Sequence, residues 1–207
     1  MNYLIVNADD FGYSPGVNKG IIKAHTEGIV TSTSVMVDSV AAAEASELTA
    51  MRNLSIGLHF VPSDTIDTEL ELNRQLEKFI TIVGKKPTHI DIHKVKHDDF
   101  ELKKCVIMFA RKNRIKARYA EGAKYINSFF GPHSNGDVSI VQLTKSIDEA
   151  NAPINELMCH VGYTDAYLLS HSSYSNIREL ELETICSAEA KAYVAKSGLK
   201  LSSWSEV

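Results

Sequence analysis

Short apolar runs rich in β-branched and aliphatic residues alternate along the chain with longer segments whose apolar positions recur at helical spacing. This alternation predicts parallel strands joined by crossover helices. Strands are expected, in chain order, at 3–6, 33–37, 55–58, 88–92, 116–119, 155–159 and 199–201. About seven parallel strands are enough for a closed or nearly closed α/β barrel. With no linker or internal repeat, the pattern predicts one domain over residues 1–207.

Helical patterns fill the gaps between these strands. Ser14 is placed to cap the first helix, with Pro15 in the first turn and Gly28 beyond the end. Gly84 has the position of a helix C-cap. The stretch 121–137 has no clean period and predicts a long loop. The remaining helices are expected at 41–51, 68–83, 98–112, 141–150 and 176–197.

Composition and charge narrow the class of function. The formal net charge is −4, and no run of Lys or Arg is longer than two residues, so neither nucleic acid nor a membrane surface is an expected partner. The apolar start ends at Asp9, too soon for a signal peptide or a spanning helix. The three cysteines form no CxxC pair, which is typical of reduced thiols. These features predict a cytoplasmic protein that acts on a small molecule.

Ionisable side chains follow four of the predicted strands at the point where each strand ends. They are Asp9 and Asp10, His59, His93 and His160. Each one alone is more simply a cap or a hydrogen-bonded loop residue. The C-terminal ends of parallel strands converge on one face, however, where ligands and catalytic groups are placed. The joint occurrence therefore favours a common site.

The type of side chain in this set points to a metal ion. Neighbouring carboxylates at Asp9 and Asp10 repel each other unless a cation or hydrogen bonds compensate. One carboxylate and two imidazoles leave coordination positions open for water and substrate, as in a catalytic site. The imidazoles favour zinc or a similar ion, whereas oxygen ligands and water favour magnesium, so both Mg²⁺ and Zn²⁺ remain candidates.

The segment 89–93 alternates strictly between polar and apolar residues, which places His89, Asp91 and His93 on one face of a strand. Polar groups that face the inside of a barrel need a ligand or a partner. The alternative is a salt-bridged rim in which His97 and the acidic residues after it begin a solvated helix.

These residues stand in motifs that resemble the YdjC family of carbohydrate deacetylases, and the matches run from the first strand to the last helix. The motifs are NADDFG at 7–12, VTSTS at 30–34, GLHF at 57–60, THIDIH at 88–93 and CHVGY at 159–163. The resemblance implies a distorted TIM-like (β/α) barrel that commonly dimerises and a divalent ion often recorded as magnesium. It implies activity on chitooligosaccharides such as diacetylchitobiose.

The resemblance also implies a role for each residue of the strand-end set. Asp9 resembles the general base and Asp10 a metal ligand, while His59 and His93 resemble the other ligands. His160 resembles the histidine that protonates the departing amine. Further candidates for substrate contact or for support of the ligands are Asp91, His97, Tyr163, Asp165 and Arg178.

The chain departs from the family pattern at three places. Val161 replaces a proline, Lys94 and Lys96 stand where the family often has more histidines, and the segment between His59 and Pro87 is short. Two alternatives therefore stay open. One is a metal-dependent amidase or esterase that acts on another small acyl compound. The other is a carbohydrate-binding protein without activity, because the two lysines could weaken the binding of a cation.

Overall fold

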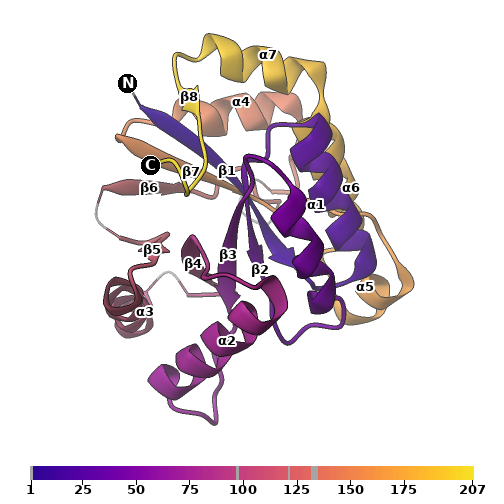
Figure 1. Cartoon of the computed structure of the whole chain (residues 1–207). Helices are drawn as coiled ribbons and strands as arrows, with labels where there is room; N and C mark the ends of the chain where they lie inside the picture. Colours follow the sequence, from indigo (N-terminus) through magenta and orange to yellow (C-terminus); the bar gives the residue numbers. More distant parts are fainter. Residues whose placement is uncertain (1, 97, 121, 132–134) are drawn as a thin grey trace.

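A single curled sheet of parallel strands forms the centre of the molecule (Figure 1). The computed structural model describes residues 2–96, 98–120, 122–131 and 135–207. The strands are β1 (Tyr3–Phe11), β2 (Ser32–Val35), β3 (Ser55–Phe60), β4 (His89–Ile92), β5 (Lys116–Ala117), β6 (Ala123–Ile126), β7 (Ile154–Cys159) and β8 (Lys200–Leu201). Their order is β5-β4-β3-β2-β1-β7-β6, and β8 pairs with the start of β1. Among the described residues no ladder joins β5 to β6, so the barrel is open on that side.

The helices lie around the outside of the curled sheet in Figure 1. They are α1 (Pro15–Glu27), the 3₁₀-helix η1 (Ala42–Ala50), α2 (Thr68–Val83), α3 (Phe100–Asn113), α4 (Ile140–Asp148), α5 (Ala166–His171), α6 (Asn176–Cys186) and α7 (Ala188–Lys196). As predicted, Ser14 caps α1 by accepting from the amide of Val17, and Gly84 ends α2 in the left-handed conformation. Within the described part of the chain, no helix combines the length and apolar character that a bilayer span requires.

The prediction of a parallel α/β barrel is confirmed, and each predicted strand overlaps an observed one. The loop predicted over 121–137 was wrong in part, because Ala123–Ile126 pairs with β7 as an edge strand. The predicted helix 176–197 is two helices. Ser187 separates them because its hydroxyl accepts from the amide of Ala190 and so caps α7. Helix α5 was not predicted at all.

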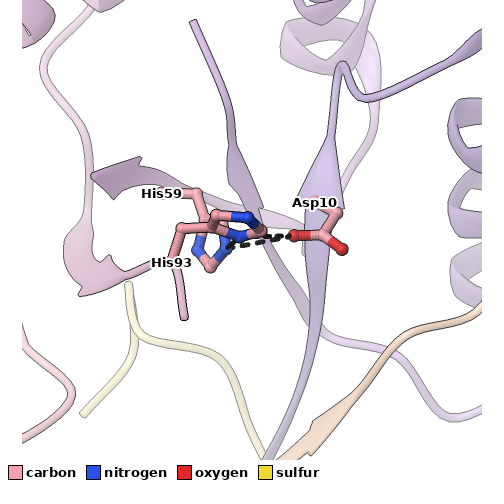
Figure 2. A group of neighbouring side chains, drawn as sticks. All are labelled: Asp10, His59 and His93. Atoms are coloured by element: carbon pink, nitrogen blue, oxygen red, sulfur yellow. Dashed lines mark hydrogen bonds and ion pairs between the residues drawn. The ribbon is translucent and has the colours of Figure 1, made fainter. Parts of the chain in front are cut away.

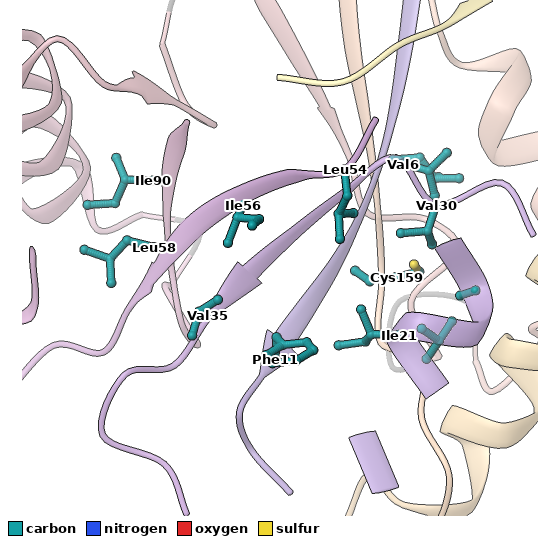
Figure 3. Packing of buried hydrophobic residues seen from close by; sticks show 14 of the residues in the cluster. Val6, Phe11, Ile21, Val30, Val35, Leu54, Ile56, Leu58, Ile90 and Cys159 are labelled. Carbon is teal, nitrogen blue, oxygen red and sulfur yellow. The ribbon is translucent and has the colours of Figure 1, made fainter. Parts of the chain in front are cut away.

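Alternate residues of each strand separate an apolar layer from a polar interior. The residues that face the helices belong to the main apolar core, among them Val6, Leu58 and Ile90 (Figure 3). On the other side of the sheet, buried polar side chains such as Asn7 and His89 bond each other, with 3.0 Å between Oδ1 and Nε2. The predicted common face of 89–93 is thereby confirmed. The interior of this barrel is lined with hydrogen-bonding and charged side chains, so a catalytic or binding site can form there.

Gly57 provides a test of this packing. A methyl group on its Cα would lie 2.4 Å from ring atoms of His89, a ring already held by Asn7, by Thr88 and by stacking on Trp204. We expect Gly57→Ala to lower the free energy of unfolding by about 1–3 kcal/mol, measured by urea denaturation. Ser32→Ala is the control, since the buried Ser32 hydroxyl has no partner among the described residues. Equal stability of Gly57→Ala and the parent chain would contradict this packing.

Candidate metal site and active site

An irregularity in β1 brings two neighbouring carboxylates into the same interior. Ala8 pairs with Thr33 and Phe11 with Val35, so two residues of β1, Asp9 and Asp10, stand opposite one residue of β2. In a regular strand these two side chains would point to opposite faces. The extra residue is accommodated because Asp10 has φ 72°, in the left-handed region. Such a conformation costs on the order of 1–3 kcal/mol and is typical of functional sites.

Asp10, His59 and His93 form a compact triangle of donor atoms at the ends of β1, β3 and β4 (Figure 2). Oδ1 of Asp10 lies 3.1 Å from Nε2 of His59 and 3.3 Å from Nδ1 of His93, and the two ring nitrogens are 3.1 Å apart. Ligands about 2.0–2.2 Å from one ion are spaced at about this distance. This Asp10 oxygen is buried and lies within ion-pair distance of both imidazole nitrogens. The triangle therefore fits one divalent cation.

Asp91 fixes the orientation of the His59 ring. Its Oδ1 lies 2.5 Å from Nδ1 of His59, and both side chains are buried. Because Nδ1 donates to this carboxylate, the neutral ring presents the lone pair of Nε2 to the triangle. Burial alone would lower the pKa of His59, but the charges and hydrogen bonds of Asp91 and Asp10 raise that pKa to about 10. A metal ion at this position therefore replaces one proton.

One arginine, Arg118, links the side of the barrel that holds the candidate metal ligands to the open side between β5 and β6. The guanidinium group of Arg118, directly after β5, holds Asp9 with two bonds of 2.8 and 2.6 Å. The same group lies 2.9 Å from Oδ2 of Asp91 and donates through Nε to Glu156 at 2.9 Å. It also lies over the ring of Tyr125 on β6, at 5.0 Å. The single positive charge of Arg118 thus compensates part of the negative charge of three buried carboxylates.

The excess of negative charge in this cluster has a visible effect on Glu156. Burial raises the pKa of Glu156 to about 7, although Arg118 opposes the shift, and its Oε2 atom has no partner among the described residues. Three buried carboxylates cannot all be neutralised by one guanidinium. The interior is therefore electrostatically suited to a divalent cation.

Arg178 binds the carboxylate oxygen of Asp10 that does not face His59 and His93. Its Nη2 donates to Oδ2 of Asp10 at 2.6 Å, and its Nε donates to the carbonyl of Tyr174 at 2.9 Å. The side chain is buried, and its guanidinium group lies over the rings of Tyr13 and Tyr174. Arg178 thus holds the Asp10 carboxylate in place through Oδ2, while Oδ1 faces the two histidines.

His160 lies at the mouth of the site. Its Nε2 is 3.9 Å from Oδ2 of Asp10, and its ring packs against Phe130 and Tyr174, with centroid distances of 4.5 and 5.8 Å. Glu181 holds the backbone amide of His160 at 2.6 Å. Burial lowers the pKa of His160 to about 4, so the ring is neutral near pH 7. Its Nδ1 is buried and has no partner among the described residues.

The other predicted residues lie farther from the triangle or have other contacts. Asp165 caps α5 through the amide of Leu168 and accepts from the amide of Gly16, while Tyr163 is 40% exposed. Their contact with substrate stays a prediction. His97 lies outside the described residues.

Sequence reasoning missed Arg118, Glu156, Glu181 and Tyr174. Arg118 stood inside one predicted strand, 116–119, and Glu156 inside another, 155–159. A charged residue in a buried strand was the available signal for both. The Tyr174 hydroxyl donates to Glu181, and Glu181 accepts from the amide of His160 on a different segment, a contact that the sequence pattern does not show.

The model of YdjC-like proteins matches residues 3–69 and 62–196. The chain belongs to the YdjC-like family. This YdjC-like chain is 33% identical to a carbohydrate deacetylase of Brevibacillus brevis, over 99% of both chains. It is 32% identical to a chitooligosaccharide deacetylase of Serratia marcescens, over 99% of this chain and 98% of that one.

Solved structures show the same architecture. A crystal structure of an Enterococcus faecalis protein matches this YdjC-like chain with a TM-score of 0.83 and 25% identity, over 99% of this chain and 98% of that one. A family 4 carbohydrate esterase from Streptomyces lividans matches with a TM-score of 0.59 and 13% identity, over 96% and 91% of the two chains. The second likeness shows the fold alone.

The hydrogen bond from His59 to Asp91 can be tested by metal binding. We expect Asp91→Asn to weaken the binding of Zn²⁺ and Mg²⁺ to metal-stripped protein by about 10–100-fold, because the ring loses its charged acceptor. Titration calorimetry measures this directly. Asp165→Asn changes a carboxylate that caps a helix and should leave metal affinity unchanged. Equal effects in the two variants would contradict the role of Asp91.

Arg118 is expected to be essential for stability. Arg118→Met leaves three buried carboxylates without their shared cation, so we expect a loss of about 3–5 kcal/mol in the free energy of unfolding. Arg118→Lys keeps the charge but not the planar fork, and its loss should be smaller. Urea denaturation at pH 7 measures both. A Met variant within about 1 kcal/mol of the parent chain would rule out this role.

Proposed function

We propose that this chain removes N-acetyl groups from an acetylated sugar by metal-dependent hydrolysis, with a chitooligosaccharide such as diacetylchitobiose as substrate. The triangle formed by Asp10, His59 and His93 carries the proposal. Support comes from the family to which the chain belongs and from the deacetylases among its relatives. The proposed cofactor is one Mg²⁺ or Zn²⁺ ion.

Three protein ligands leave room for water and for the substrate carbonyl, as catalytic sites do. A bound divalent ion supplies a nucleophilic water and polarises the acetyl carbonyl. Asp10 and the two histidines would hold this ion. Arg178 and Asp91 would keep two of these ligands, Asp10 and His59, in place through the bonds described above.

Asp9 is the proposed general base. Arg118 holds both of its carboxylate oxygens, and the side-chain amide of Asn7 donates to one of them at 2.7 Å. These contacts fix the carboxylate within 4.8 Å of a ring nitrogen of His59, one of the residues of the metal triangle. In the proposed reaction Asp9 accepts a proton from the attacking water. A positioned base of this kind contributes about 10²–10⁴-fold to the rate.

His160 is the proposed proton donor to the departing amine. An amine leaves poorly as an anion, so the C–N bond needs a proton on nitrogen as it breaks. Because the His160 ring is neutral before the reaction, it must first take up a proton. In the proposed reaction, Asp9 passes the proton that it accepted from water to His160, which delivers it to the sugar nitrogen. Water adds to the acetyl carbon, the C–N bond breaks, and the products are acetate and a free amino sugar.

Acetate release from diacetylchitobiose tests the proposal. We expect release by metal-stripped protein only after Mg²⁺, Zn²⁺, Co²⁺ or Ni²⁺ is returned. Asp9→Asn and His160→Ala should each lower kcat by about 10²–10⁴-fold, because each removes a proton-transfer group. His171→Ala changes an exposed histidine on α5 and serves as the matched control.

Two other outcomes would contradict deacetylation of this sugar, and a third would contradict the role of Asp9. Release of acid only from small amides or esters would favour an amidase or esterase. Metal and sugar binding without turnover would indicate a binding protein. Full activity of Asp9→Asn would remove the proposed base.

A further inference from the structure

The chain is shorter than its relatives in its interior. Its alignment with the Brevibacillus brevis deacetylase is 246 positions long and that with the Serratia marcescens enzyme 253, whereas the chain has 207 residues. At least 39 and 46 positions therefore have no counterpart here. Because the alignments cover nearly all of each protein, the missing residues are internal. The family match is divided where its two parts overlap, at 62–69.

This division falls in the connection between β3 and α2. Residues 61–67 lead directly from the strand that carries His59 to Thr68, the first residue of α2. Val61 is held at both backbone groups by the side chain of Gln75, at 3.1 and 2.7 Å. Asp67 caps α2 by accepting from two backbone amides. The connection is thus a closed, hydrogen-bonded turn on the same side of the sheet as the metal triangle.

The short connection starts beside the more exposed ligand. The amide of His93 donates to the carbonyl of Phe60 at 2.8 Å, so β3 ends next to His93. The side chains of Asp10 and His59 are each 2% exposed, whereas His93 is 14% and His160 13% exposed. The site therefore meets solvent at His93 and His160. Additional residues inserted at 62–69 would lie on the His93 side of the solvent-exposed part of the site.

We propose that the short β3–α2 connection leaves the His93 side of the site open, so that substrate extends past the reacting sugar over residues 61–67. The chain then deacetylates units within longer chitooligosaccharides. This inference rests on the proposed function. The connection suits a sugar, because its surface offers the hydroxyl groups of Ser63 and Thr65 beside Ile66, which is 40% exposed.

The test is a series of N-acetylglucosamine oligomers from two to six units, assayed with the metal-loaded protein. We expect kcat/KM to rise at least about tenfold from the dimer to the tetramer, because additional sugar units gain binding contacts. Mass spectrometry of the products should place free amines at internal units. The Brevibacillus brevis relative, assayed in parallel, should show no such rise. Binding of the same oligomers to Asp9→Asn, measured by calorimetry, should tighten with length.

Two changes in the connection sharpen the test. Replacing 62–66 by the corresponding segment of the Brevibacillus brevis relative should preserve zinc affinity and dimer hydrolysis but abolish the preference for length. Ile66→Ala should lower kcat/KM for the tetramer and not for the dimer, whereas Leu180→Ala, on the exposed side of α6, should change neither.

The outcomes separate this inference from the proposed function. Acetate release from the dimer, with no gain for longer oligomers and modification of terminal units only, overturns the inference and leaves a deacetylase. Longer oligomers that bind Asp9→Asn no more tightly than the dimer also overturn it. No acetate from any oligomer, with any metal, overturns both.

Discussion

The ion pairs of Arg118 hold the interior of this barrel together. Its guanidinium group, directly after β5, reaches Asp91 on the neighbouring strand β4, and also Asp9 on β1 and Glu156 on β7, which do not pair with β5. Buried carboxylates without a cation would cost several kcal/mol each. Since β5 and β6 share no ladder, these side-chain contacts link the two edges of the sheet across the open side. Asp91 in turn orients His59, so the metal triangle depends on the same group.

The balance of charge explains why this interior suits a divalent cation. Among the described residues, Asp9, Asp10, Asp91 and Glu156 are buried in this interior together with two arginines, Arg118 and Arg178. His59 carries a proton in the absence of metal, because its carboxylate neighbours raise its pKa to about 10. A divalent ion would take over the role of that proton and relieve the remaining repulsion. The charge of the site therefore favours a divalent cation.

Much of the fold followed from patterns within single segments. Helix α2 was predicted at its observed bounds, 68–83, because its apolar positions recur at helical spacing and Gly84 has the position of a C-cap. Strand β6 was not predicted, because four residues at a sheet edge bury only one apolar side chain fully, Ile126. The break at Ser187 was missed because the helical pattern continues across it, and only the capping hydroxyl marks a new helix.

The sequence by itself determined which strands carry the candidate ligands, because a polar residue directly after a buried strand must lie at the converging ends of a parallel sheet. Tertiary structure decided how these residues meet. Asp9 and Asp10 both face the interior of the barrel only because the register between β1 and β2 shifts at these residues. The register between two strands cannot be read from the sequence of either strand alone. Arg118 and Arg178 reach these aspartates from 109 and 168 residues away. The pattern within one segment determines which face of the sheet a residue occupies. Its partner across the barrel is decided by which strands the folded sheet places near each other.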